Sequence, residues 1–249
     1  TSPVTVTVGE LQVADTAEAW SRAGFAIDSD AVCSVGGVGL RLLGGEQGTG
    51  VVSWSLRGLP DGWAGELDGI PTAAWHDDPA TPGAHANGVI AIDHVVLLSP
   101  DLGRTVESLA AIGVQPRRER DGELGGRPIR QVFFRLGEVI VEVVGSPTTA
   151  AEGPSSLWGI TYVVADIDGT VAFFGEHTTP AKDAVQPGRR ITTLHHRAFE
   201  MSVRTALISS PVRQKLHSFS WNISLFFINP FSYFFRLYAF RITLPDFVW

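Results

Sequence analysis

The chain repeats one arrangement of an apolar strand followed by a helix. The stretch HVVLLSPDLGRTV at 94–106 aligns without gaps with GITYVVADIDGTV at 159–171, and Asp101 and Asp166 take the same place in the two stretches. In each copy, the run of apolar and β-branched residues predicts a buried strand, and the Asp that follows favours the positive end of a helix. In the first copy, Ser99 is expected to cap that helix and Pro100 to take its first position. A unit of this size cannot bury its own apolar face, so the copies are expected to pair.

The stretch from 90 to 144 gives the fullest version of the unit. IAIDHVVLLS predicts a strand, SPDLGRTVESLAAIG predicts a helix that ends at Gly113, and QVFFRL and EVIVEVV predict two strands joined by a tight turn. Residues 4–59 and 156–209 show the same order of elements. The prediction is an α+β fold built from repeated β-α-β-β-β units.

Composition divides the chain into four parts. Residues 1–60 are expected to form a divergent unit, 61–89 a linker rich in Pro, Gly and Asp, and 90–209 two paired units at 90–146 and 156–209. The last part, 210–249, has no Gly and holds eight of the fourteen Phe residues. We expect this aromatic tail to be foreign to the domain. A membrane-spanning helix is the alternative, which Arg236 near its middle disfavours.

Charge and cysteine content exclude several functional classes. The net charge of −7 argues against a nucleic-acid partner, which requires a basic surface. Cys33 is the only cysteine, so a disulfide framework is excluded and a reducing, cytoplasmic location is expected. The first residues lack the pattern of a secretion signal, and no membrane partner is expected for the domain.

Two ionisable residues interrupt strands that are otherwise apolar. His94 lies in the first strand of the 90–146 unit, and Glu142 lies in its last strand. Strict alternation places His94 on one face together with Ile92 and Val96. A carboxylate buried alone would be strongly destabilising or would become protonated, so Glu142 needs a partner, and His94 is the candidate. The pair is predicted to be a metal half-site, an acid–base pair, or a hydrogen-bonded structural pair.

The motifs D-H-V-V-L at 93–97 and V-I-V-E-V-V at 139–144, set in repeated units, resemble the vicinal oxygen chelate superfamily in its bacterial glyoxalase-like form. The resemblance covers residues 4–208. It implies half-barrel sheets with a concave cleft, in which the first and last strands of two units hold a divalent ion such as Mg, Mn, Fe, Ni or Zn. His94 and Glu142 match the ligand positions of one unit. Gly159 and Ala206 occupy these positions in the partner unit, and neither can bind a metal.

The resemblance also implies a small-molecule function. The first hypothesis is an enzyme, a lyase, isomerase or dioxygenase, that binds a small oxygenated substrate in the cleft, with His94 and Glu142 as its catalytic and metal-binding residues. The alternative is a non-catalytic protein that sequesters a ligand such as a drug there and keeps a vestigial metal site.

Three further residues are predicted to bind the substrate. Arg130 and Gln131 precede a buried strand and are expected to point into the cleft, and Arg118 is expected to recognise a carboxylate or phosphate at its lip. A solvated loop balanced by its own acidic residues is the alternative for the arginines. The first unit is expected to pair either within the chain or across a homodimer.

Overall fold

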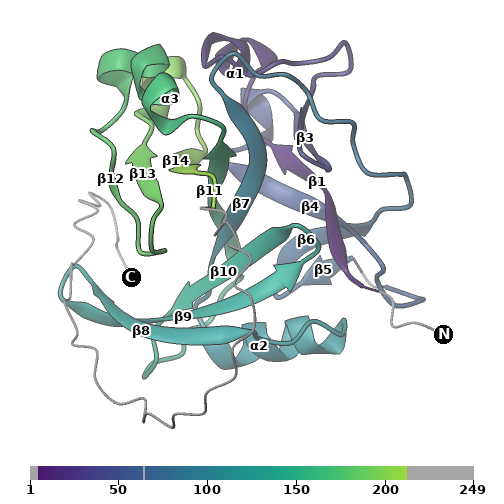
Figure 1. The fold of residues 1–249 in the computed structure, drawn as a ribbon. Helices are drawn as coiled ribbons and strands as arrows, with labels where there is room; N and C mark the ends of the chain where they lie inside the picture. Colours follow the sequence, from purple (N-terminus) through teal and green to yellow (C-terminus); the bar gives the residue numbers. More distant parts are fainter. Residues whose placement is uncertain (1–4, 64, 212–249) are drawn as a thin grey trace, which may run out of the picture.

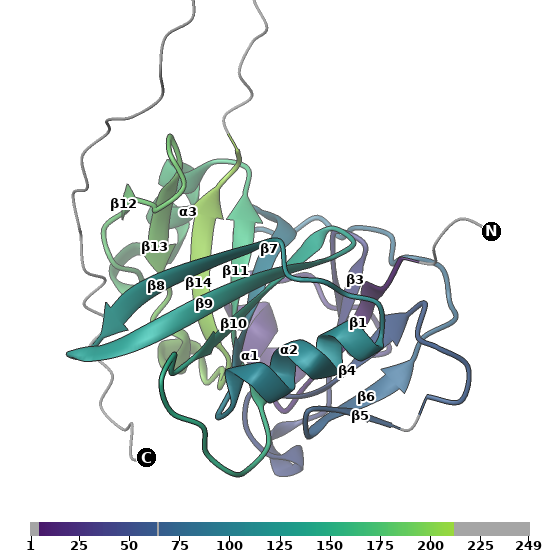
Figure 2. The ribbon, with the colours of Figure 1, turned by 90° about the horizontal axis from the view of Figure 1, so that it is seen from below.

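The computed structural model describes residues 5–63 and 65–211, and the aromatic tail predicted at 210–249 lies almost entirely outside them. The described chain forms one curved sheet with three α-helices on its outer side (Figures 1 and 2). The elements in chain order are β1 (Thr7–Val13), α1 (Ala17–Arg22), β2 (Val32–Val35), β3 (Val38–Leu42), β4 (Val51–Arg57), β5 (Glu66–Leu67), β6 (Ile70–Ala74), β7 (Val89–Leu98), α2 (Leu102–Ala111), β8 (Arg118–Leu124), β9 (Arg127–Leu136), β10 (Val139–Gly145), β11 (Ser156–Val164), α3 (Ile167–Phe174), β12 (Lys182–Asp183), β13 (Arg190–Thr193) and β14 (Arg204–Ser209).

The second and third units pair through their first strands. The strand order is β8-β9-β10-β7-β11-β14-β13-β12, with β7 antiparallel to β11 at the centre. In each unit the last strand lies parallel to the first, β10 beside β7 and β14 beside β11. Figure 1 shows β7 standing upright while β8 and β9 cross below it, which displays the curvature of the sheet. The predicted α+β fold of repeated units on a curved sheet is confirmed.

The repeated aspartates cap both helices, so Asp101, and not the expected Ser99, is the N-cap residue of α2. The Asp101 side chain accepts a hydrogen bond from the Arg104 backbone N–H at the start of α2, and Asp166 does the same for Asp168 at the start of α3. After α2, Gly113 takes a left-handed backbone with φ of 82°.

The N-terminal part differs from the unit expected for residues 1–60. Strand β4 does not close that unit beside β3; it lies on the other side of β1, antiparallel to it, and begins a second group with β5 and β6. The expected linker at 61–89 therefore contains two strands. They are joined by Asp68 and Gly69, both with positive φ, as tight hairpin turns require, and they bury Leu67 and Ile70.

The apolar side of the sheet packs against the helices, and its other side carries the polar residues of interest. In β10, Val139, Val141 and Val143 are fully buried, while Ile140, Glu142 and Val144 face the opposite way. None of the helices within 5–63 and 65–211 has the length and apolar character that crossing a membrane requires.

Candidate functional site

A β-bulge in β7 brings Asp93 and His94 onto the same face of the sheet. His94 lies opposite Thr161 of β11, but Ile92 lies opposite Tyr162, so Asp93 has no counterpart in β11. Asp93 Oδ2 is 2.8 Å from His94 Nδ1. The bulge also turns Ile92 into the apolar core, where it is 3% exposed, so strict alternation wrongly placed it beside His94.

Glu142 lies next to His94 on this face. Ile140 of β10 is the register partner of His94, and Glu142 follows two residues later, so it points the same way. His94 Nε2 is 3.5 Å from Glu142 Oε2, and the two side chains are 15% and 13% exposed. The structure thus brings together the two residues that the sequence singled out, and their role in chemistry stays a prediction.

Arg189 extends the network behind Asp93. Its Nη1 is 2.6 Å from Asp93 Oδ1, and its Nε donates to the Ser209 carbonyl at 2.8 Å. Burial alone would raise the pKa of Asp93, but the hydrogen bonds and charges of His94 and Arg189 outweigh it and hold that pKa below its usual range. Asp93 is therefore a carboxylate at neutral pH and accepts from both neighbours.

Gln131 extends the network on the other side of Glu142. Its amide nitrogen donates to Glu142 Oε1, and its amide oxygen accepts from Arg120 Nε at 2.8 Å. A continuous chain of polar contacts therefore runs from Arg189, which immediately precedes β13, through β7, β10 and β9 to Arg120 on β8.

The two predicted arginines lie on opposite faces of the sheet. Arg118 shares the face of Gln131, and its Cζ is 4.6 Å from the centroid of the Phe133 ring. Arg130 points to the other face, where it binds Asp121 with Nε–Oδ1 at 2.7 Å. The structure therefore does not bring Arg130 to the site, because neighbouring residues of β9 alternate between faces.

The third unit offers no metal ligands opposite His94 and Glu142. A side chain on Gly159 would place its Cβ 2.9 Å from the Arg204 carbonyl oxygen, and Ala206 lies beside Thr161 with no donor atom. Nowhere in the described part of the chain do three His, Cys, Asp or Glu side chains gather in a way that could hold an ion. Because Asp93 is already engaged by His94 and Arg189, only two ligands remain, and divalent ions require more. The residues present do not fit the metal centre that the resemblance implied.

Sequence reasoning missed three members of the network, Asp93, Arg189 and Arg120. Asp93 stood beside His94 in the sequence, but alternation assigned it to the opposite face. Neither Arg189 nor Arg120 lies in an apolar run, so the pattern of the sequence did not single them out. The available signal was a third charged group, Asp93, in an apolar strand.

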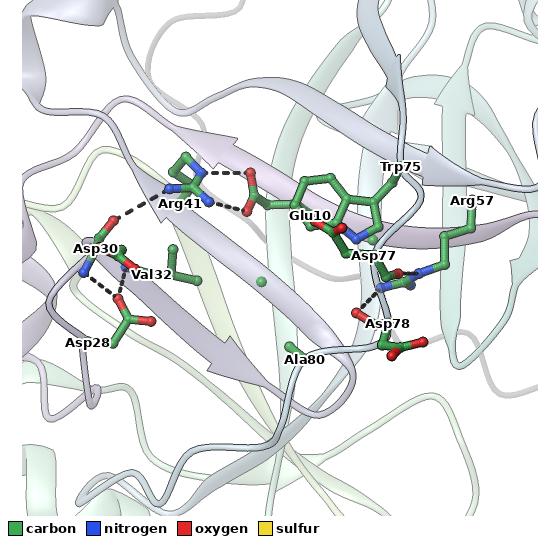
Figure 3. A pocket seen from close by; sticks show the side chains of 12 residues that line it. Glu10, Asp28, Asp30, Val32, Arg41, Arg57, Trp75, Asp77, Asp78 and Ala80 are labelled. Carbon is green, nitrogen blue, oxygen red and sulfur yellow. Dashed lines mark hydrogen bonds and ion pairs between the residues drawn. The ribbon is translucent and has the colours of Figure 1, made fainter.

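Among the cavities in the described part of the chain, two lie over the N-terminal strands. The first, about 240 Å³, is lined by the Glu10–Arg41 ion pair and by Trp75 (Figure 3), and the second, about 380 Å³, by Gln12, Ser55 and their neighbours. Neither cavity is lined by His94 or Glu142.

Two solved structures of enzymes have a similar fold over most of this chain. A mutant of 4-hydroxymandelate synthase from Streptomyces coelicolor matches over 85% of this chain and 94% of its own, with 15% identity and a TM-score of 0.54. An extradiol ring-cleaving dioxygenase from B. fuscum matches over 84% of this chain and 72% of its own, with 12% identity and a TM-score of 0.51. The sequence itself matches no protein-family profile and no curated protein.

At such identities the similarity concerns the fold and not the activity. The strand order, the parallel first and last strands of each unit and the curved sheet agree with it. The chain has the glyoxalase-like fold of the vicinal oxygen chelate superfamily.

Proposed function

We propose that the sheet face carrying His94 and Glu142 binds a small oxygenated organic molecule, and that these two residues exchange a proton with it without a divalent metal. The observation that supports the proposal is that His94, on β7, has Asp93 next to one of its ring nitrogens and Glu142 of β10 near the other. Groups that face each other in this way are suited to general acid–base catalysis.

The contacts of His94 define which of its nitrogens would act. The Asp93 carboxylate can only accept a hydrogen bond, so Nδ1 of His94 carries the hydrogen and donates the hydrogen bond to Asp93. Nε2 is then the nitrogen that can take up or release a proton, and it faces Glu142. Arg189 holds Asp93 in place, as the buried acid of a triad is held. Proton transfer next to a carbonyl group, the chemistry of isomerases and lyases, suits this arrangement.

Proton exchange provides the test. The full chain is incubated with 2-oxobutyrate or phenylpyruvate in D₂O, and deuterium uptake at the carbon beside the carbonyl is followed by NMR. The wild type should accelerate uptake, and H94Q and E142Q should each slow it by roughly 100-fold or more. R130Q, which changes an arginine on the opposite face, should behave as the wild type.

Metal content tests the metal-free part of the proposal. Protein supplied with Mg²⁺, Mn²⁺, Fe²⁺, Ni²⁺ or Zn²⁺ and then desalted should retain none of them in stoichiometric amounts. Stoichiometric metal that disappears in H94A and E142A would overturn this part and restore His94 and Glu142 as ligands.

A non-catalytic binding protein is the second candidate. It is favoured by Gly159 and Ala206, because neither side chain can transfer a proton or bind a metal at the two positions that correspond to His94 and Glu142. Under this alternative the same probes bind to the face, but deuterium uptake proceeds at the uncatalysed rate in wild type and variants alike.

A further inference from the structure

The positively and negatively charged side chains of β8 lie on opposite faces of the strand. Arg118 and Arg120 lie opposite Phe133 and Gln131 and share the face of Glu142. Glu119 and Asp121 point to the other face, where Arg130 contacts both. The acidic residues that would balance the two arginines in a solvated loop are therefore directed away from them by the alternation of the strand.

The two arginines share one aromatic ring. Arg118 Cζ lies 4.6 Å and Arg120 Cζ 5.9 Å from the centroid of Phe133. Arg120 also donates through Nε to Gln131, which binds Glu142. Such stacking orients guanidinium groups and leaves their remaining N–H groups directed at the edges.

Neither arginine has an acidic partner within residues 5–63 and 65–211. By contrast, Arg130 and Arg189 each bind a carboxylate. Two like charges held over one ring repel each other unless an anion lies between them. A guanidinium group can pair with a carboxylate, which accepts two hydrogen bonds at once, so a carboxylate is an anion suited to this position.

We infer that Arg118 and Arg120 bind the carboxylate of the molecule on which His94 and Glu142 act. The substrate of the protein is then a small organic acid. The inference rests on the proposed function for the identity of the reacting face. Gln131 couples the anion site to the proton-transfer site through two hydrogen bonds, and Phe133 offers apolar contact to the body of the acid. Two arginines on a chain of net charge −7 suit a single small anion and not a polyanion.

The test compares an acid with its neutral amide. Binding of 3-phenyllactate and 3-phenyllactamide to the full chain is measured by calorimetry, because the two compounds differ only in the charged group. The wild type should bind the acid about tenfold or more tightly than the amide, as expected for a charge-assisted contact. R118Q and R120Q should each lose most of this preference, and R130Q, the matched control on the opposite face, should keep it.

The outcomes separate this inference from the proposed function. Equal affinity for acid and amide, no binding of either at millimolar concentration, or an equal loss in R130Q would overturn the carboxylate site. If the preference for the acid depends on Arg118 and Arg120 but H94Q and E142Q leave deuterium exchange unchanged, the carboxylate site stands and the acid–base role fails.

Discussion

Asp93 and His94 are consecutive in the sequence, yet their side chains lie on the same face of β7 and contact each other at 2.8 Å. The bulge makes this contact possible, because two consecutive residues of a regular strand point to opposite faces. The carboxylate is thereby placed between the imidazole and the buried guanidinium of Arg189.

The first prediction concerns the Asp93–Arg189 pair. D93N removes the negative charge and leaves Arg189 charged in a site where both side chains are more than nine-tenths buried, so the free energy of unfolding should fall by about 3 kcal/mol in urea at neutral pH. D121N is the matched control. It breaks an exposed pair with Arg130 and should change stability by less than about 1 kcal/mol. If D93N loses as little stability as D121N, the charge of Arg189 must be stabilised by groups other than Asp93.

The second prediction concerns Asp68, which joins the β5–β6 turn to α2. Its carboxylate is 2% exposed and accepts hydrogen bonds from Arg104, Thr105 and Ser155. D68N keeps the size of the side chain and tolerates its left-handed backbone, but loses the charge, and it should lower the free energy of unfolding by about 2 kcal/mol. D61N, at an exposed position, should leave the urea midpoint unchanged. An unchanged midpoint in D68N would show that the charge of Asp68 does not stabilise the contact between the β5–β6 turn and α2.

The third prediction is a pH dependence that originates at His85. Its Nδ1 accepts from the Ala26 N–H and its Nε2 donates to the Ser34 carbonyl, both at 3.0 Å, which fixes the neutral ring. Burial lowers the pKa of His85, and the contact with Ser34 opposes this only in part. The unfolded chain therefore binds the proton more readily, and stability should fall as pH drops below the ordinary histidine pKa of about 6.5.

Urea midpoints of the wild type and H85Q, measured at about pH 7.5 and about pH 5.5, check this prediction. The wild type should lose more stability between the two values than H85Q, because the amide does not titrate. Burial also lowers the pKa of His196, but this histidine is present in both proteins, so the difference between them reports His85. Equal losses would be inconsistent with a neutral ring held by the two backbone contacts.

The fourth prediction concerns Gly159, the counterpart of His94 in the third unit. An added Cβ would lie 2.9 Å from the Arg204 carbonyl oxygen, so G159A must force β11 and β14 apart and should lower stability by about 2 kcal/mol. Gly122 of β8 is the matched control, since a Cβ there would meet Ile129 at an ordinary 3.7 Å, and G122A should change stability by less than about 0.5 kcal/mol. Thermal or urea unfolding of both variants measures the contrast. A tolerated G159A would mean that this position can accommodate a ligand side chain.

Local sequence patterns were sufficient to predict the repeated unit, the main strands and helices of residues 90–209, and the approach of His94 to Glu142. These depend on local signals: apolar periodicity, Asp at helix starts, and the alternation of side chains along a strand. β7 and β10 are the first and last strands of one unit and lie side by side in the sheet. Two polar residues on the same face of these strands are therefore close to each other.

Four features could not be predicted in this way: the bulge at Asp93, the contact of Arg189 with Asp93, the hairpin within 61–89, and the opposite faces of Arg118 and Arg130. Each depends on which backbone groups pair between segments far apart in the chain, and a shift of one residue in that pairing moves a side chain to the other face. Local composition carries no information about such a shift. For this reason the sequence identified His94 and Glu142, whereas the network that joins them to Asp93, Arg189 and Arg120 depends on the register of the sheet.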